Sequence, residues 1–532
     1  MNRRDIFRTA LGTAATSVLA ALSGTRASAA VDAGNQSMPW RRGVEGQRMA
    51  DMGNGFLLNP IMGGDRPDPA ILQDGSDYYM TFSSFHSYPG LIIWHSRDLV
   101  NWQPRKPAIT RNIGSVWAPS LVKANGRYFI YIPTVGPNAI HVLWADSIDG
   151  PWSDPIDLNL PNHIDPCCAL GEDGSRWLFL NKGDRIRLAD DGLSTIGAVE
   201  HVYDPWRYPD DWTIEGFSPE GPKIYRRGDW FYYISAVGGT AGPPTSHMVI
   251  VARSRSIHGP WENCPNNPLV RTVDSSEKWW SRGHASFVDG PDGKTWAIYH
   301  GFENGFWTLG RQALLDPVEW TADGWPRMTG GDLSRPILKP LGGQALPHGL
   351  ALSDDFRTLK LGSNWNFFKP SPNEQGRVAV RDGALVLKAA GTTPSDSRPL
   401  LLIPGDQAYE FECDIEITPG VNAGLLLFYD EKLYCGLGFD EQQMLAPQYG
   451  EMRIRPETSP GRRLRIRATN DRHIVTYHTS TDDGATWKRF ERSMEVSGYH
   501  HNVRYGFLSL KPGIYAAGKG EAIFRDFRFR AI

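Results

Sequence analysis

Three carboxylic acids in this chain of 532 residues stand in short proline-containing phrases that are far apart in the sequence. Asp68 lies in RPDPA, Asp165 in HIDP, and Glu220 in EGP, directly before a strand-like run. A proline directly after the acid, or one residue later, predicts an extended chain at the acid. A carboxyl group held at the edge of a sheet in this way can act as a general acid or base. A single such glutamate can equally be a solvated turn residue, because charged side chains are mostly exposed.

A repeated phrase supplies the elements that must position these acids. A polar turn followed by an aromatic strand occurs five times, and its glycines are Gly75, Gly126, Gly174, Gly228 and Gly293. Steps of roughly 50 residues with a few short strands each are typical of propeller blades, whereas a β-helix has a much shorter repeat. We therefore expect a five-bladed β-propeller over residues 55–340. Equivalent points of successive blades, including the three acids, then converge on its central channel.

The chain after residue 340 follows a different pattern. Residues 341–350 are rich in glycine and form a predicted linker, and the repeat stops there. Tyr409 to Ile417 alternates apolar with acidic residues, and Leu464 to Ala468 alternates apolar residues with arginines, as half-buried antiparallel strands do. Many short strands of this kind predict a β-sandwich over residues 351–532, so the fold class is all-β. The sandwich can either pack against the propeller or bind sugar, and the sequence favours packing.

Composition and charge favour a neutral substrate. The formal net charge is -3 and no long run of either sign occurs, which argues against a nucleic acid or an anionic membrane as partner. The sequence contains no CxxC pair of the kind that binds zinc, and the cysteines are few and odd in number. We expect mostly buried thiols without disulfides at the five positions, which are Cys167, Cys168, Cys264, Cys413 and Cys435.

Residues 1–30 have the pattern of a twin-arginine signal peptide. Arg3 and Arg4 precede a short apolar run, and a cleavage site of the A-x-A type ends at Ala29. The apolar run is too short to span a bilayer. We therefore expect export to the periplasm or the outside of the cell, with no membrane segment after the signal is removed. The alternative is an amphipathic N-terminal helix that stays on the protein.

Eight phrases follow one another along the first part of the chain. They are RPDPA (66–70), SSFHSYPG (83–90), SRDLVNW (96–102), VWAPSL (116–121), HIDP (163–166), EGPKIYRRGDWFYY (220–233), GHASF (283–287) and GRQALLDPVEW (310–320). In this order they resemble the phrases of the family 43 glycoside hydrolases, which are five-bladed propellers of plant-polysaccharide breakdown. Taken singly, EGP or DP means little, but eight in the right order argue against chance. The part after residue 340 resembles the concanavalin-like sandwich behind many β-xylosidases of that family.

The resemblance implies a role for each matching residue. The general base falls on Asp68, the general acid on Glu220, and the aspartate that tunes and orients the acid on Asp165. The implied substrate-binding residues are Phe85, Trp117, His284 and Arg311. His284 is also implied to bind water or calcium, and the sequence contains no motif for an organic cofactor. On the residues alone, His284 can equally be a satisfied core histidine, and Trp117 can be part of the packing of a blade.

Hydrolysis with inversion explains why two acids are needed and a third helps. One carboxyl must be protonated and the other ionised, at a separation of ~6.5–9.5 Å that admits a water. We expect an anionic Asp165 to raise the pKa of Glu220 by like-charge repulsion. The sequence therefore predicts an inverting exo-glycosidase that hydrolyses β-xylosides or α-L-arabinofuranosides of hemicellulose, with an oligosaccharide or polysaccharide as its partner. The alternatives are an exo-galactanase or arabinanase on the same scaffold, and a propeller that binds glycan without turnover.

Two positions depart from the family pattern. Val237 stands where an acidic residue is usual, and the pair Cys167 and Cys168 follows the HIDP phrase. We expect Val237 to be the first place where the preference for one sugar is set. The two thiols are a second place where the shape of the sugar pocket can differ.

Overall fold

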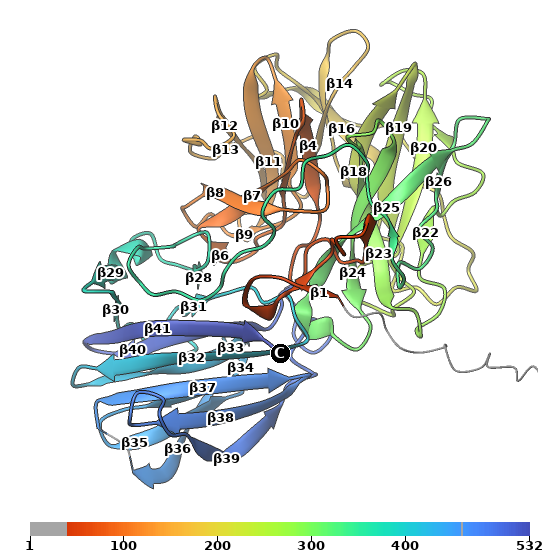
Figure 1. The fold of residues 1–532 in the computed structure, drawn as a ribbon. Helices are drawn as coiled ribbons and strands as arrows, with labels where there is room; N and C mark the ends of the chain where they lie inside the picture. The colour runs from red at the N-terminus through yellow and green to blue at the C-terminus, as the bar shows by residue number, and fades with distance from the viewer. Residues whose placement is uncertain (1–39, 459–460) are drawn as a thin grey trace, which may run out of the picture. The chain divides into compact units, whose positions relative to one another are not determined.

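The computed structural model describes residues 40–458 and 461–532, so the predicted signal peptide of residues 1–30 lies outside the described residues. The described chain is all-β, with four short 3-10 segments as its only helical elements (Figure 1). None of these segments is long and apolar enough to cross a membrane. The segments are η1 (Val44–Gly46), η2 (Asn181–Gly183), η3 (Trp307–Leu309) and η4 (Glu374–Arg377).

Five antiparallel sheets between residues 70 and 328 confirm the five predicted blades (Figure 1). Two short strands, β9 (Ser115–Val116) and β22 (Val270–Arg271), extend the second and the fourth blade. The first two blades are β4 (Ala70–Asp74), β5 (Asp77–Thr81), β7 (Gly90–Ser96) and β8 (Gln103–Ile109), then β10 (Ser120–Ala124), β11 (Arg127–Val135), β12 (Ala139–Ala145) and β13 (Ile156–Asp157). The third is β14 (Cys167–Leu170), β15 (Arg176–Phe179), β16 (Asp184–Leu188) and β17 (Thr195–His201). The last two are β18 (Glu220–Arg227), β19 (Trp230–Val237), β20 (Met248–Ser254) and β21 (Glu262–Asn263), then β23 (Trp279–Asp289), β24 (Thr295–Glu303), β25 (Arg311–Trp320) and β26 (Pro326–Met328).

The five repeated glycines occupy the same place in every blade, between its first and second strand. All five have a positive φ, between 57° and 77°, which glycine adopts without a steric penalty. In the first and fourth blades Gly75 and Gly228 belong to two-residue hairpin loops. The repeat visible in the sequence is therefore the turn that starts each blade.

Hydrophobic cores lie between neighbouring blades, and backbone contacts close the ring. Trp102 of the first blade and Trp296 of the last are both almost fully buried in one such core. The short strands β3 (Phe56–Leu57) and β27 (Ile337–Leu338) pair with each other. Closer to the channel, the backbone N–H of Arg66 donates to the carbonyl of Arg311 at 2.7 Å. This bond fixes the segment that leads to Asp68 against the last blade.

The C-terminal part is a sandwich of an eight-stranded and a seven-stranded sheet, as predicted. Its core is one large apolar cluster between the two sheets. The eight-stranded sheet runs β36 (Glu451–Thr458), β35 (Gln443–Gln448), β34 (Leu433–Phe439), β33 (Val421–Asp430), β40 (Lys511–Gly518), β31 (Leu400–Leu401), β28 (Asn366–Phe368) and β6 (Ser87–Tyr88). The seven-stranded sheet runs β29 (Val378–Arg381), β30 (Ala384–Lys388), β41 (Glu521–Ala531), β32 (Ala408–Ile417), β37 (Arg463–Asp471), β38 (Ile474–Ser480) and β39 (Lys488–Glu495).

The edge strand of the eight-stranded sheet comes from the propeller part of the chain. Strand β6 lies within the SSFHSYPG phrase, and its two residues pair with Phe367 and Phe368 of β28. The Lys511 side chain of β40 donates a hydrogen bond to the Ser87 hydroxyl at 3.2 Å. The sandwich therefore packs on the propeller through a shared sheet as well as through side chains.

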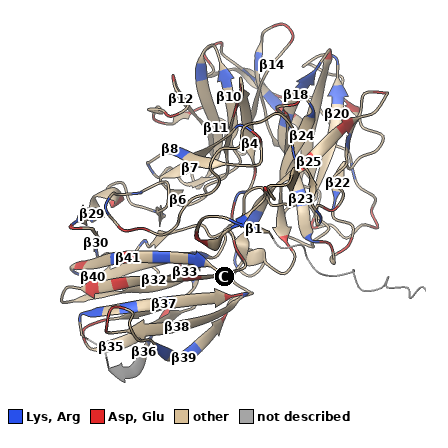
Figure 2. Ribbon diagram, viewed as in Figure 1, with Lys and Arg blue, Asp and Glu red and all other residues tan. Residues whose placement is uncertain are grey.

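Strand β32 confirms the alternating segment seen in the sequence, but it is more buried than expected. It lies in the middle of its sheet, between β37 and β41. Its acidic residues face the arginines of both neighbours (Figure 2). Glu412 and Asp414 are therefore almost fully buried as paired charges.

The five cysteines are all buried and free, which confirms the expectation from their number and spacing. In the predicted linker, residues 341–350 contain no strand. A further two-stranded sheet, β1 (Arg41–Arg42) with β2 (Arg48–Met49), precedes the propeller.

Candidate active site

One pocket at the central channel brings together all seven site residues that the sequence predicts. It is lined by eleven residues. Ten of them come from the propeller part of the chain and one from the sandwich. The lining residues are Asp68, Phe85, Trp117, Ala118, Ile164, Asp165, Glu220, Thr240, His284, Arg311 and Phe507.

The three acids stand at equivalent places of three blades. Asp68 and Asp165 lie two residues before β4 and β14, and Glu220 is the first residue of β18. Each of these strands is the first of its blade. The three acids therefore meet at the central channel, as the repeat predicts.

The backbone at the pocket is strained in a way that the sequence did not indicate. Asp68 and Asp165 have φ values of 57° and 56°, so the extended conformation predicted from the following prolines is wrong for both. Aspartate tolerates this left-handed region better than most residues. His284 (59°), which lines the same pocket, also adopts it, and Phe85 (47°) does so at a higher cost. Four such residues in one pocket mark it as a functional site.

Asp68 is held as an anion. Its Oδ1 accepts a hydrogen bond from Arg311 Nη1 at 3.0 Å, and its Oδ2 accepts one from Ser83 Oγ at 2.5 Å. Its backbone N–H donates to His300 Nδ1 at 3.1 Å. Burial opposes ionisation, but the charge of Arg311 and the neighbouring His284 and His300 outweigh it and hold the pKa of Asp68 well below its ordinary value.

Glu220 is held in the opposite state. Its side chain is 19% exposed, and its Oε1 lies 3.7 Å from His247 Nε2. Burial is the largest cause that raises the pKa of Glu220 well above its ordinary value, and the charges of Asp165 and Asp68 add to it. The expected repulsion by Asp165 is present, but the cost of desolvating the charged form of Glu220 is larger.

Asp165 is placed to hold the acid. Its Oδ2 accepts a hydrogen bond from the backbone N–H of Gly221, the residue after Glu220, at 2.9 Å. The Asp165 side chain is also buried, and burial first and the charge of Asp68 second raise its pKa. A deprotonated Asp68 and a protonated Glu220 in one small pocket form an acid and base pair. Asp165 fixes the backbone of the acid.

Aromatic rings form the walls of the pocket. Trp117 meets Phe85 edge to face at 6.5 Å and Phe507 at 5.4 Å. Trp117 also packs on the sandwich core, so it serves both the pocket and the packing. The Arg311 guanidinium lies 5.7 Å from the Phe85 ring and 5.4 Å from the Phe507 ring. Arg311 was expected to bind substrate hydroxyls, and here it also holds the predicted base.

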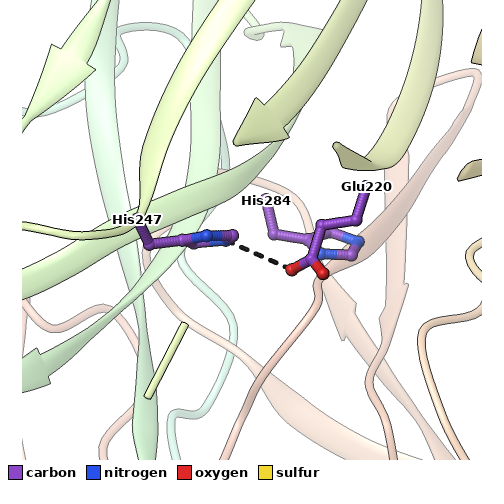
Figure 3. Close-up of side chains that lie close together, drawn as sticks. All are labelled: Glu220, His247 and His284. Atoms are coloured by element: carbon purple, nitrogen blue, oxygen red, sulfur yellow. Dashed lines mark ion pairs between the residues drawn. The ribbon is translucent and has the colours of Figure 1, made fainter. Parts of the chain in front are cut away.

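Two buried histidines stand beside the acid (Figure 3). His284 and His247 are almost fully buried, and none of their four ring nitrogens makes a hydrogen bond with a described residue. The alternative that His284 is a satisfied core histidine therefore fails. His284 Nδ1 lies 3.4 Å from Asp68 Oδ1.

The same residues test the expected calcium. Glu220, His247 and His284 each offer a ligand atom, and these atoms lie within 4.8 Å of one another. Calcium takes six to eight oxygen ligands, whereas this group supplies two imidazole nitrogens and one carboxylate. The donor set does not fit calcium, and we derive no step through it.

Sequence reasoning missed several residues of the site, among them His247. Thr240 lines the pocket, and its hydroxyl lies 3.2 Å from His300 Nε2. The His300 ring stacks on that of His247 at 5.2 Å. No pattern in the sequence marks Thr240 or His300, because nothing local distinguishes a channel-facing side chain from a packing one. Phe507 lies in a loop of the sandwich with no repeat to mark it.

The two departures from the family pattern lie outside the pocket. Val237 is fully buried in a small core with Met248 and Ile250, beneath aromatic residues of the segment 202–219. Val237 therefore does not line the pocket, and it can affect the preference for one sugar only through this core. Cys167 and Cys168 line a separate cavity formed by the first strands of the blades.

Comparisons with known proteins agree with this fold. The model of glycosyl hydrolases family 43 matches residues 57–326, and the chain therefore belongs to that family. The beta xylosidase C-terminal concanavalin A-like domain matches residues 353–530. The three carboxylates at the channel therefore lie in the glycosyl hydrolase domain. The sandwich matches the C-terminal domain that is named for beta xylosidases.

Named relatives cover most of the chain. A non-reducing end alpha-L-arabinofuranosidase of Bacteroides ovatus is 29% identical over 87% of this chain and 92% of that protein. A beta-xylosidase of Bacillus subtilis is 30% identical over 72% of this chain and 78% of that protein. The crystal structure of a xylan beta-1,4-xylosidase from Bacillus halodurans superposes with a TM-score of 0.79 at 25% identity, covering 89% of this chain and 99% of that one.

Proposed function

We propose that this family 43 hydrolase is an inverting, exo-acting glycosidase that removes terminal β-xylosyl or α-L-arabinofuranosyl residues from hemicellulose. The observation that carries the proposal is that Asp68 and Glu220 line one small pocket with pKa values shifted in opposite directions. Inversion requires one ionised and one protonated carboxyl on either side of the sugar. The names of the relatives from Bacteroides and Bacillus supply the class of sugar.

In the proposed reaction a terminal sugar occupies the pocket and a water stands beside Asp68. Asp68 takes a proton from the water as the water oxygen bonds to the anomeric carbon. Glu220 gives its proton to the glycosidic oxygen as the bond between that oxygen and the anomeric carbon breaks. Arg311 keeps Asp68 ionised until this step, and Asp165 holds the acid through its bond to Gly221.

The exo mode rests on the closure of the pocket by the sandwich. Phe507 comes from the loop between β39 and β40 and stands against Trp117, which belongs to the propeller. A pocket closed on this side admits the end of a chain and excludes its middle. We therefore expect single sugars as products, released from the non-reducing end.

A β-xyloside is the first candidate among the pentosides, because the accessory sandwich is of the kind named for β-xylosidases. An α-L-arabinofuranoside is the second, because the Bacteroides relative carries that name and spans most of the chain. Both sugars are neutral, in keeping with a chain that has little net charge.

A screen of nitrophenyl pentosides tests the function, and proton NMR of the first-formed anomer tests the stereochemistry. We expect release of nitrophenol from the β-D-xyloside or the α-L-arabinofuranoside, and a first-formed sugar of inverted configuration. Absence of release from both would favour a propeller that binds glycan without turnover. A retained configuration would contradict the roles of Asp68 and Glu220.

We also propose that the protein is exported by the twin-arginine route to act on its polymer outside the cytoplasm. The support is the sequence of residues 1–30 alone. Replacing both Arg3 and Arg4 by lysine should leave the protein inside the cytoplasm, as cell fractionation would show.

A further inference from the structure

The sandwich loop that supplies Phe507 also carries an exposed tyrosine. Tyr505 is 88% exposed, the largest value among the exposed large hydrophobic residues of the described chain. Its backbone is nevertheless held, because the Tyr429 hydroxyl lies 2.9 Å from the carbonyl of Arg504 and 3.3 Å from that of Tyr505. The N–H of Leu508 donates to the same hydroxyl at 3.3 Å. The hydrogen bonds to Tyr429 therefore hold the backbone at this exposed aromatic ring.

The exposed ring continues a row of rings that starts in the pocket. The His501 ring stacks on Phe507 at 4.0 Å with an angle of 17° between the planes. It meets the Tyr505 ring edge to face at 6.0 Å. The N–H of Phe507 donates to His501 Nδ1 at 2.9 Å, which ties the row together. The row therefore leads from the wall of the pocket to the solvent.

The row is uncharged. Burial lowers the pKa of His501 to about 4, so its ring is neutral at neutral pH. Arg504 is the only lysine, arginine or acid in the loop of residues 497–510, and it is paired with Asp430 at 3.2 Å. Aromatic rings with one polar edge, such as tyrosine, suit ligands that are apolar on one face and wet on the other. Pyranose sugars have such faces.

We propose that Tyr505 is a platform for the leaving-group sugar of an oligosaccharide, directly outside the pocket that holds the terminal sugar. The inference rests on the proposed exo-glycosidase function. The pocket holds one sugar, so the rest of the substrate must leave it past its rim. Phe507, His501 and Tyr505 provide a continuous aromatic surface on the sandwich side of that rim.

The test compares an oligosaccharide with a glycoside whose leaving group is too small to reach Tyr505. We measure kcat/KM for xylotetraose and for methyl β-D-xyloside, or for the corresponding pair of α-L-arabinofuranosides. Tyr505→Ala should lower kcat/KM about three- to tenfold for the oligosaccharide and leave the methyl glycoside unchanged, the size of one stacking contact. Tyr505→Phe keeps the ring and should retain the value of the unaltered enzyme.

Leu170→Ala is the matched control. Leu170 is 52% exposed at the far end of β14, whereas Asp165 lies before the start of that strand. This variant should leave both substrates unaffected. Equal losses on both substrates with Tyr505→Ala, or none on either, would overturn the platform while the glycosidase function stands.

Binding of the oligosaccharide to an inactive enzyme tests the Tyr505 platform separately from the proposed glycosidase reaction. Calorimetry of xylotetraose, or of the arabinose-bearing oligosaccharide, with the Asp68→Asn enzyme should show a three- to tenfold weaker affinity when Tyr505→Ala is added. An enzyme that hydrolyses no pentoside, but binds the oligosaccharide in a Tyr505-dependent way, would refute the proposed reaction and keep the platform. Unchanged or absent binding would refute the platform.

Discussion

The catalytic pocket and strand β32 of the sandwich both bury carboxylates, but they differ in whether a cation is paired with the carboxylate. Glu412 accepts hydrogen bonds from Arg465 at 2.7 Å and from Arg467 at 2.7 Å. Glu220 and Asp165 have no arginine or lysine within ion-pair distance among the described residues. Buried charges that are paired hold a sheet together, whereas burial without a neighbouring cation raises the pKa of a carboxyl. The difference separates a structural carboxylate from one that can do chemistry.

The largest effect is expected in the pocket. Glu220→Ala should lower kcat for a disaccharide about 10³-fold, because the departing sugar then leaves without its proton. The loss should be much smaller on a nitrophenyl glycoside, whose leaving group needs little protonation. Steady-state kinetics on both substrates measure the contrast. Near-normal turnover of the disaccharide by this variant would contradict the assignment of Glu220 as the general acid.

On the sandwich side, Arg465→Ala should cost stability instead of activity. It leaves Glu412 buried with less compensation, and breaking such a pair costs about 3 kcal/mol. Thermal unfolding measures the loss, and kcat well below the transition should stay near that of the unaltered enzyme. Arg530→Ala on β41 is the control, because this arginine is 64% exposed and its pair with Glu410 is worth under about 1 kcal/mol. Equal losses in the two variants would contradict the distinction.

A smaller effect is expected at Asp165. Asp165→Asn removes a charge that helps to raise the pKa of Glu220, so the acid should lose its proton at lower pH. The alkaline limb of the pH profile of kcat/KM should move to lower pH, and kcat should fall roughly 10-fold to 100-fold because the acid is less well positioned. An unchanged alkaline limb would show that burial alone sets the protonation of Glu220.

The smallest effect concerns stability and pH. A carboxyl whose pKa is raised in the folded state binds its proton more tightly there, so stability falls as pH rises above the ordinary value of 4.5. Glu220→Gln cannot ionise and should escape this loss. Its Tm relative to the unaltered enzyme should therefore be higher at about pH 8 than at about pH 4. Glu319→Gln, at an exposed pair with Arg327, should show no such change. A difference that shrinks with rising pH would reverse the sign and exclude a protonated Glu220.

Much of this arrangement was readable from the sequence. The repeated glycines, among them Gly75, predicted the blades because a tight turn with positive φ tolerates few other residues. The acids were found because three prolines marked equivalent strand starts. The left-handed backbone at Asp68 was not predictable, because it depends on His300 of another blade.

Other features depend on contacts that no local pattern encodes. Phe507 reaches the pocket only after the sandwich has folded and packed on the propeller, so the sequence around it carries no signal. Val237 was expected to set the preference for one sugar because it stands where an acidic residue is usual, but packing against Met248 places it in a core. The departure from the family pattern is therefore one of local packing.

Strand β6 affects whether the sandwich of this protein can be replaced by another domain. Phe85 forms a wall of the sugar pocket, and two residues later Ser87 and Tyr88 complete the edge of the sandwich sheet. Any graft that exchanged the C-terminal module for another would therefore rewrite the loop that holds the sugar. The junction between the propeller and the sandwich lies inside the binding site. The two modules can therefore be exchanged only together.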